Sequence, residues 1–240
     1  MDAIVLNNLE KTYATGTRAL NGVSFSVAQG SMLALLGGNG AGKTTIIGIL
    51  TGLVRKTGGT ATVLGIDLDK DPEGLRAQIG VVPQEFNFNI FEKVINIVVD
   101  QAGYYGVPRK EALPRAENLL KELGLWEKRD AVSRTLSGGM KRRLMIARAL
   151  VHNPKVLLLD EPSAGVDVEL RREMWEFVRG LHTKGTTIVL TTHYLEEAQQ
   201  LCERVVIVKK GEVVRDGLVA DLLRDTHTET LEDAYFSVTQ

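Results

Sequence analysis

Cysteine, aromatic residues and long apolar runs are all scarce in this sequence of 240 residues. The single cysteine, Cys202, excludes a disulfide bond within the chain, which is typical of proteins from a reducing compartment. The longest unbroken apolar run extends only from Met32 to Leu36, whereas a helix that spans a bilayer needs about 20 apolar residues. The N-terminus also lacks the basic-then-apolar pattern of a secretory signal. We therefore expect a soluble cytosolic protein with no membrane span.

An excess of charge of either sign is missing as well. Lysine and arginine together number 29, and aspartate and glutamate together number 30, so the formal net charge is −1. This balance argues against a protein that holds nucleic acid mainly through bulk positive charge, and we expect no nucleic-acid partner. No internal repeat or low-complexity linker divides the chain, so we expect a single domain over residues 1–240.

Short apolar segments alternate with predicted helices along most of the chain. Residues 3–30 contain short segments separated by turn residues, a pattern typical of an antiparallel or mixed sheet. The run at 32–36 predicts a buried central strand. Other strands are predicted at 60–66, 79–82, 156–160 and 187–190, a hairpin at 205–214 with its turn at Lys210-Gly211, and helices at 44–53, over much of 91–150 and after Asp167. Such alternation favours an α/β layer fold with a mainly parallel sheet.

A glycine-rich segment fits the pattern G-x-x-x-x-G-K-[ST] and lies between a predicted strand and a predicted helix, the setting that this motif requires. Its residues are Gly37, Gly38, Asn39, Gly40, Ala41, Gly42, Lys43, Thr44 and Thr45. Glycines let the loop wrap phosphate oxygens with backbone N–H groups, and the next helix offers its positive N-terminal end. Lys43 can reach the β- and γ-phosphates, and the Thr44 hydroxyl can bind Mg²⁺. The motif predicts a nucleoside-triphosphate site.

An acidic pair follows the predicted buried strand 156–160, with Asp160 at its end and Glu161 directly after it. Ligands of open α/β sheets bind at this edge of the sheet. Asp160 suits a direct or water-mediated partner of Mg²⁺. Glu161 points elsewhere, because it is one residue further along, and can polarise an attacking water molecule.

A third motif distinguishes among the protein classes that share these two. The segment Leu136-Ser137-Gly138-Gly139-Met140 precedes a predicted helix. Ser137 and the glycine N–H groups at a helix start form a second anion site. The segment resembles the signature motif of ATP-binding cassette (ABC) ATPases. The resemblance implies ATP and Mg²⁺ as ligands. It also implies an α/β P-loop NTPase (RecA-like) core, with an N-terminal antiparallel β subdomain and an inserted α-helical subdomain.

The resemblance places the core and β subdomain at 1–84 and 155–217, the helical subdomain at 85–154 and a short tail at 218–240. It implies a head-to-tail homodimer, in which Ser137, Gly138, Gly139 and Met140 close on the ATP of the other subunit. The resemblance also implies that Tyr13 stacks on adenine and that Gln84 contacts Mg²⁺ and water. It implies that Asp167 lies at the dimer interface and that His193 contacts the γ-phosphate. Catalysis then rests on Glu161, His193, Lys43 and Gln84.

Three motif positions depart from the family pattern. Met140 replaces the usual signature glutamine, and Gly38 stands where many relatives have proline. The segment before the helix after Asp167 reads Gly165-Val166-Asp167 rather than the commoner leucine-containing form. With these features the sequence resembles the ABC-2 export branch, which includes drug and polysaccharide exporters. The tail segment 230–236 also resembles the tail of drug-exporter ATPases.

What the ATPase moves is a separate question. The resemblance favours an exporter, with a membrane-spanning permease subunit at the cytoplasmic face of the inner or plasma membrane. An aromatic cluster at 85–107 suits either a groove for that permease or the core of the helical subdomain; its members are Phe86, Phe88, Phe91, Tyr104 and Tyr105. The alternatives are an ABC ATPase that acts on nucleic acid or ribosomes, and a regulatory cassette without hydrolysis. We expect His152, His182, His227 and the basic cluster at 141–143 to be solvated.

Overall fold

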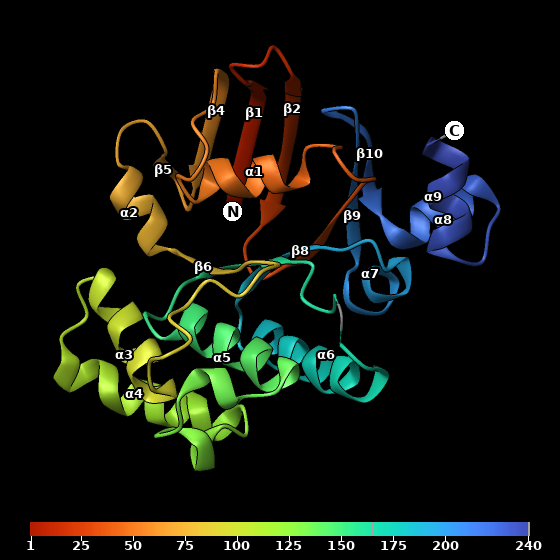
Figure 1. Cartoon of the computed structure of the whole chain (residues 1–240). Coiled ribbons are helices and arrows are strands. Elements are labelled where there is room, and N and C mark those ends of the chain that lie inside the picture. The colour runs from red at the N-terminus through yellow and green to blue at the C-terminus, as the bar shows by residue number, and fades with distance from the viewer. Residues whose placement is uncertain (165, 240) are drawn as a thin grey trace.

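The computed structural model describes residues 1–164 and 166–239, except for the side chain of Leu170. Gly165, two positions before the predicted interface residue Asp167, lies outside the described residues. Within them the strands form two sheets, and the helices lie around the larger one (Figure 1). No helix in this part of the chain combines the length and the apolar character needed to cross a bilayer.

The smaller sheet is antiparallel and has the strand order β2-β1-β4-β5 across the described residues. Its strands are β1 (Asp2–Thr12), β2 (Arg18–Ala28), β4 (Gly58–Val63) and β5 (Ile66–Asp67). Leu6 of β1 pairs with Phe25 of β2, and the side chains of both residues are buried on the inner face of this sheet. The first two strands are longer than the sequence predicted, since pairing with each other extends them through polar positions.

The larger sheet has the order β10-β9-β3-β8-β7-β6 in the described part of the chain. Its strands are β3 (Met32–Leu36), β6 (Ile79–Val82), β7 (Val156–Asp160), β8 (Thr187–Thr191), β9 (Arg204–Lys209) and β10 (Glu212–Leu218). The pairs among β9, β3, β8, β7 and β6 are parallel, and β10 pairs antiparallel with β9. The predicted hairpin is confirmed: Lys210 and Gly211 both have positive φ angles, 50° and 80°, as a type I′ turn requires.

Helices cover both faces of the larger sheet. They are α1 (Lys43–Leu50), α2 (Pro72–Ala77), α3 (Val94–Tyr104), α4 (Arg109–Glu122), α5 (Gly138–Leu150), α6 (Val168–Thr183), α7 (Leu195–Leu201), α8 (Val219–Thr226) and α9 (Leu231–Thr239). Short 3₁₀ helices occur at 126–128 and 133–135. In Figure 1, α1 lies beside the antiparallel sheet, whereas α3, α4 and α5 form a helical part below it.

Alternate residues of the central strands pack into two different hydrophobic cores, one on each face of the larger sheet. Leu33 and Leu158 pack with α1 and the antiparallel sheet. Leu36 and Leu157 pack on the opposite face with α3 to α6. Because successive side chains of a strand point to opposite faces, an entirely apolar strand such as 32–36 joins both layers.

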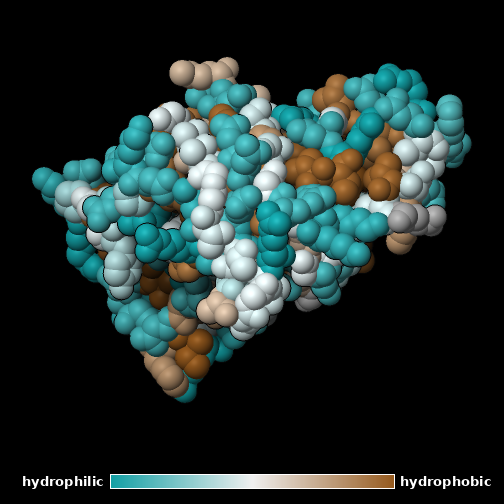
Figure 2. All heavy atoms as spheres, turned by 90° about the horizontal axis from the view of Figure 1, so that it is seen from above, coloured by the Kyte–Doolittle hydropathy of each residue, from teal (hydrophilic) through white to brown (hydrophobic). Residues whose placement is uncertain are grey.

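The surface seen from above is mostly hydrophilic (Figure 2). An apolar area lies on the side where Figure 1 places β10 and the C-terminal helices. Three apolar residues of β10 and α9, Val214, Leu218 and Phe236, are exposed by 43%, 49% and 51%.

Candidate active site

A polar pocket of about 820 Å³ opens between the antiparallel sheet and the carboxyl ends of the parallel strands. Its lining joins the β1–β2 turn to the glycine-rich loop and to the segments after β6, β7 and β8. The residues are Tyr13, Thr17, Arg18, Ala19, Asn39, Gly40, Ala41, Gly42, Lys43, Thr44, Thr45, Gln84, Glu161 and His193. Residues separated by up to 180 positions therefore meet at the sheet edge where α/β proteins bind ligands.

The glycine-rich loop is closed by its own lysine. Lys43 Nζ donates to the Gly37 carbonyl at 2.6 Å and to the Gly38 carbonyl at 3.3 Å. Burial lowers the pKa of Lys43, while the carboxylates of Glu161 and Asp160 act in the opposite direction. Gly42 stands before α1 with φ of 117°, a conformation that glycine adopts without strain. The loop thus directs the first N–H groups of α1 toward the pocket, as phosphate binding requires.

Gly37→Ala tests how tightly this loop is packed. A Cβ atom at Gly37 would lie 2.3 Å from the Val208 carbonyl oxygen and 2.9 Å from the Ala41 Cβ. We expect the variant to lose about 1–3 kcal/mol in free energy of unfolding, because backbone would have to move. Chemical denaturation measures this loss.

The matched control is Gly180→Ala within α6, where an added Cβ meets nothing within 4 Å. That variant should be as stable as the unsubstituted chain or more so, because alanine favours helix over glycine. Equal unfolding free energies for Gly37→Ala and Gly180→Ala would contradict the close packing of the loop against β9.

The acidic pair is divided into a buried and an accessible carboxylate. Asp160 is 6% exposed and accepts a hydrogen bond from Thr191 Oγ1 at 2.5 Å. Burial raises the pKa of Asp160. Glu161 has a left-handed φ of 49°, and its N–H donates to the Thr191 carbonyl at 3.0 Å. This uncommon conformation for a non-glycine residue is stabilised by β8, and it places the Glu161 side chain in the pocket lining.

Gln84 and His193 converge on Glu161. Gln84 Nε2 donates to Glu161 Oε2 at 3.1 Å, and His193 Nδ1 lies 3.1 Å from the same oxygen. A carboxylate only accepts, so we assign the ring hydrogen to Nδ1, which leaves Nε2 of the neutral ring as an acceptor. The His193 ring also packs at a tilt on Tyr194, with centroids 4.0 Å apart.

Comparison with known proteins agrees with this geometry. The family described as ABC transporter matches residues 20–164. The chain belongs to the ABC transporter family. The Nod factor export ATP-binding protein I of Burkholderia orbicola is 41% identical over 214 residues, 89% of this chain and 70% of that protein. The daunorubicin/doxorubicin resistance ATP-binding protein of Streptomyces peucetius is 40% identical over 220 residues, 92% of this chain and 66% of that protein.

A solved dimeric cassette in a post-hydrolysis state, bound to ADP and phosphate, superposes with a TM-score of 0.82. It is 29% identical and covers 90% of this chain and 98% of its own. The expected ABC fold is therefore confirmed, and the chain is an ABC ATPase that binds and hydrolyses ATP.

Tyr13 lies at the edge of the ATPase pocket. Its hydroxyl is 3.3 Å from Thr45 Oγ1, and the ammonium of Lys11 lies 4.8 Å from the ring centroid. The ring is 37% exposed. An aromatic face is thus held beside the phosphate loop, where a base could stack on it.

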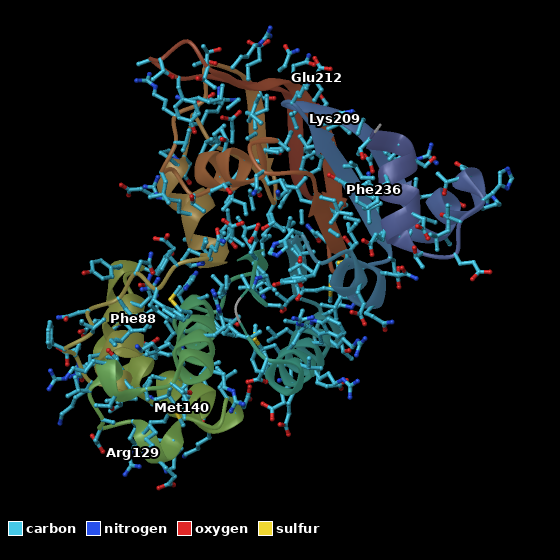
Figure 3. The ribbon with its side chains drawn as sticks, turned by 45° about the vertical axis from the view of Figure 1, so that its right-hand side comes forward. Phe88, Arg129, Met140, Lys209, Glu212 and Phe236 are labelled. Atoms are coloured by element: carbon cyan, nitrogen blue, oxygen red, sulfur yellow. The ribbon has the colours of Figure 1, made fainter. Side chains whose placement is uncertain are left out.

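The signature motif of this cassette lies away from the pocket. Ser137 caps the start of α5 and accepts a hydrogen bond from Met140 N–H at 3.3 Å. Together with Asp167 it lines a separate hollow of about 260 Å³. Among the described residues, the lining of the polar pocket includes neither Asp167 nor 137–140. Figure 3 shows Met140 in the helical part, remote from the antiparallel sheet.

The aromatic cluster is divided between core and surface. Tyr105 stacks on His152 with centroids 3.7 Å apart, and Phe88 packs against the core. These two rings therefore fit the interpretation as core residues of the helical subdomain rather than as part of a groove for a permease. Phe86, Phe91 and Tyr104 are exposed by 43%, 67% and 85%.

Two of the expectations about solvated residues are wrong. The His152 ring is half-buried, its Nε2 lies 3.0 Å from the Ile79 carbonyl oxygen, and burial lowers its pKa to about 4. Arg142, within the basic cluster, is only 3% exposed. Sequence reasoning also missed Thr191, which contacts both acidic residues of the site. Its position two residues before His193 is the one signal that could have identified it.

Proposed function

We propose that this ABC ATPase is the nucleotide-binding subunit of an exporter and drives transport through a separate permease. The observation that carries the proposal is the convergence of Gln84, Glu161 and His193 beside the phosphate loop, which is the arrangement that phosphoryl transfer to water needs. Export is supported by the names of the relatives, one of which acts in Nod factor export. Their different cargoes leave the transported compound open.

The residues of the pocket fit an ATP molecule with Mg²⁺. Thr44, Gln84 and Asp160 offer hydroxyl, amide and carboxylate oxygens, the donors that Mg²⁺ prefers. The described residues hold no group of three or more acidic, histidine or cysteine side chains that could bind a metal ion alone. Phosphate oxygens and water would complete the coordination of a metal that arrives with the nucleotide. Bound Mg²⁺ would neutralise charge on the β- and γ-phosphates.

The catalytic roles follow from the contacts. Glu161 accepts the proton of the attacking water, because its carboxylate faces the pocket and is oriented by two neighbouring side chains. His193 accepts a hydrogen bond from that water through its free Nε2, and Lys43 stabilises the negative charge that develops on the transferred group. The phosphate loop binds the phosphates, while Tyr13 stacks on adenine.

We further propose a head-to-tail homodimer. Three signature residues, Ser137, Gly139 and Met140, line their own hollow together with Asp167, outside the polar pocket of the same chain. A second copy can bring its signature to that pocket, and the dimeric state of the solved cassette supports this arrangement. The helical subdomain at 85–154 would then carry the signature toward the partner, while α8 and α9 of the tail lie away from this subdomain (Figure 1).

The permease would dock near 85–107, at the cytoplasmic face of the membrane. The exposed rings of Phe86, Phe91 and Tyr104 support this surface, because exposed aromatic residues are enriched at protein interfaces. The balanced net charge gives no support to a nucleic-acid partner.

Phosphate release from ATP by the full chain, with Mg²⁺ and then with excess EDTA, tests the enzymatic part of the proposal. We expect hydrolysis with Mg²⁺ and background rates with EDTA. Copurification with membranes tests the transport part, and a membrane-spanning polypeptide should elute with the cassette. Hydrolysis that is indifferent to EDTA, or a cassette whose partner is a ribosome or DNA, would contradict the proposal.

A further inference from the structure

The side chain of Arg142 crosses from the signature helix to the loop that carries Gln84. Arg142 Nη1 donates to the Pro83 carbonyl and Nη2 donates to the Gln84 carbonyl, both at 2.9 Å. The guanidinium carbon lies 5.2 Å from the centroid of the Phe86 ring. One residue of α5, itself almost fully buried, thus contacts Pro83, Gln84 and Phe86 of the loop.

The chemistry of this contact depends on arginine. A guanidinium is planar and presents its donors as a fork, so it can serve two neighbouring carbonyl oxygens and stack on a ring at once. Lysine offers a single ammonium and cannot reproduce both bonds in one geometry. A buried charge is costly unless it is hydrogen-bonded, and the two loop carbonyls supply acceptors for the buried guanidinium of Arg142.

The contact leads directly to the catalytic carboxylate. The backbone that Arg142 holds is that of Gln84, whose side chain donates to Glu161 Oε2 at 3.1 Å. We propose that Arg142 is a positioning residue for ATP hydrolysis: it fixes the backbone of Gln84 from the signature helix and thereby sets the place of the Glu161 carboxylate.

Neighbouring contacts extend the attachment. Arg148, further along α5, donates through Nη1 to the Asn87 carbonyl at 3.1 Å, and Ser133 Oγ donates to the Asn89 carbonyl at 3.0 Å. Hydrogen bonds from Arg142, Arg148 and Ser133 therefore connect the segment 83–89 to the helical part. Because Ser137 caps the start of α5, a shift of the signature would reach Gln84 through Arg142.

Hydrogen exchange tests the structural half of this proposal without any catalysis. In the full chain, Arg142→Gln should raise amide exchange in the peptide that covers 84–92 about fivefold, as the loss of a hydrogen bond to a charged group allows more local opening. Lys141→Gln, the matched control, removes the adjacent charge of the same helix and should leave exchange in this peptide unchanged. Unchanged exchange in Arg142→Gln would overturn the proposal.

A double-mutant cycle tests the catalytic half, which rests on the proposed ATPase role of Glu161. Arg142→Gln should lower kcat about 10- to 100-fold with little change in KM for ATP, because small displacements of catalytic groups are that costly. In the Gln84→Ala background the same substitution should have almost no further effect on kcat.

Two results would refute this coupling. One is that Arg142→Gln lowers kcat by the same factor in the unsubstituted chain and in the Gln84→Ala variant. The other is that Arg142→Gln leaves kcat unchanged. Arg142→Lys should recover little of the rate, since it restores the charge without the fork. Failure of the proposed function would look different, because the unsubstituted chain would then lack Mg²⁺-dependent hydrolysis while the exchange result still decides whether Arg142 orders the loop.

Discussion

Glu161→Gln is expected to lower kcat for ATP hydrolysis about 10²- to 10⁴-fold and to leave the affinity for ATP unchanged. Glutamine keeps an oxygen that can accept from Gln84 Nε2 and His193 Nδ1, so the geometry around position 161 is preserved. It cannot take a proton from water, so the loss falls on the chemical step. Single-turnover phosphate release and equilibrium binding of ATP measure the two quantities separately.

A second consequence concerns assembly. If ATP holds two cassettes together, slow hydrolysis should make Glu161→Gln a stable dimer in ATP and Mg²⁺ but a monomer in ADP, as light scattering can show. Glu203→Gln, an exposed glutamate outside the pocket lining, is the control and should behave as the unsubstituted chain. A wild-type rate in Glu161→Gln would assign the base to another residue.

Local patterns in the sequence predicted the central features because they determine local structure directly. The apolar run at 32–36 is buried along its whole length, and the glycine-rich loop after it closes around Lys43. The acidic pair could be placed at a strand end because strand and carboxylates are adjacent in the chain. In each case a short segment contains both the structural signal and the chemical group.

Tertiary packing explains what the sequence did not predict. Arg142 and His152 have polar side chains in segments with polar neighbours, which favours solvent exposure, but both become enclosed by residues distant in the chain. The hydrogen-bond partners of Arg142 are backbone carbonyl oxygens. Every residue has such a group, so the residue types in the sequence do not indicate which ones Arg142 will contact. Similarly, the contact of Gln84 with Glu161 joins two loops from neighbouring strands, so its existence depends on the strand order β8-β7-β6.

Lys43→Ala should have the largest effect on nucleotide binding, with ATP affinity about 10- to 100-fold lower and kcat lowered further by about 10²-fold. The ammonium lies among loop carbonyls, where it can exchange these acceptors for the β- and γ-phosphates. Isothermal titration with ATP in the presence of Mg²⁺ measures the first loss, and phosphate release measures the second.

The stability of the unliganded chain should not fall in this variant, which separates lost binding from misfolding. Burial lowers the pKa of Lys43, so at neutral pH its charged form is less favourable in the folded chain than in the unfolded one. Alanine removes that cost together with the two hydrogen bonds to the loop carbonyls, and the two changes offset each other. Lys56→Ala is the matched control, because Lys56 Nζ also donates to a glycine carbonyl, that of Gly59 at 2.7 Å, and lies outside the pocket lining. Lys56→Ala should bind ATP normally. Normal binding by Lys43→Ala would show instead that the glycine-rich loop does not hold the phosphates.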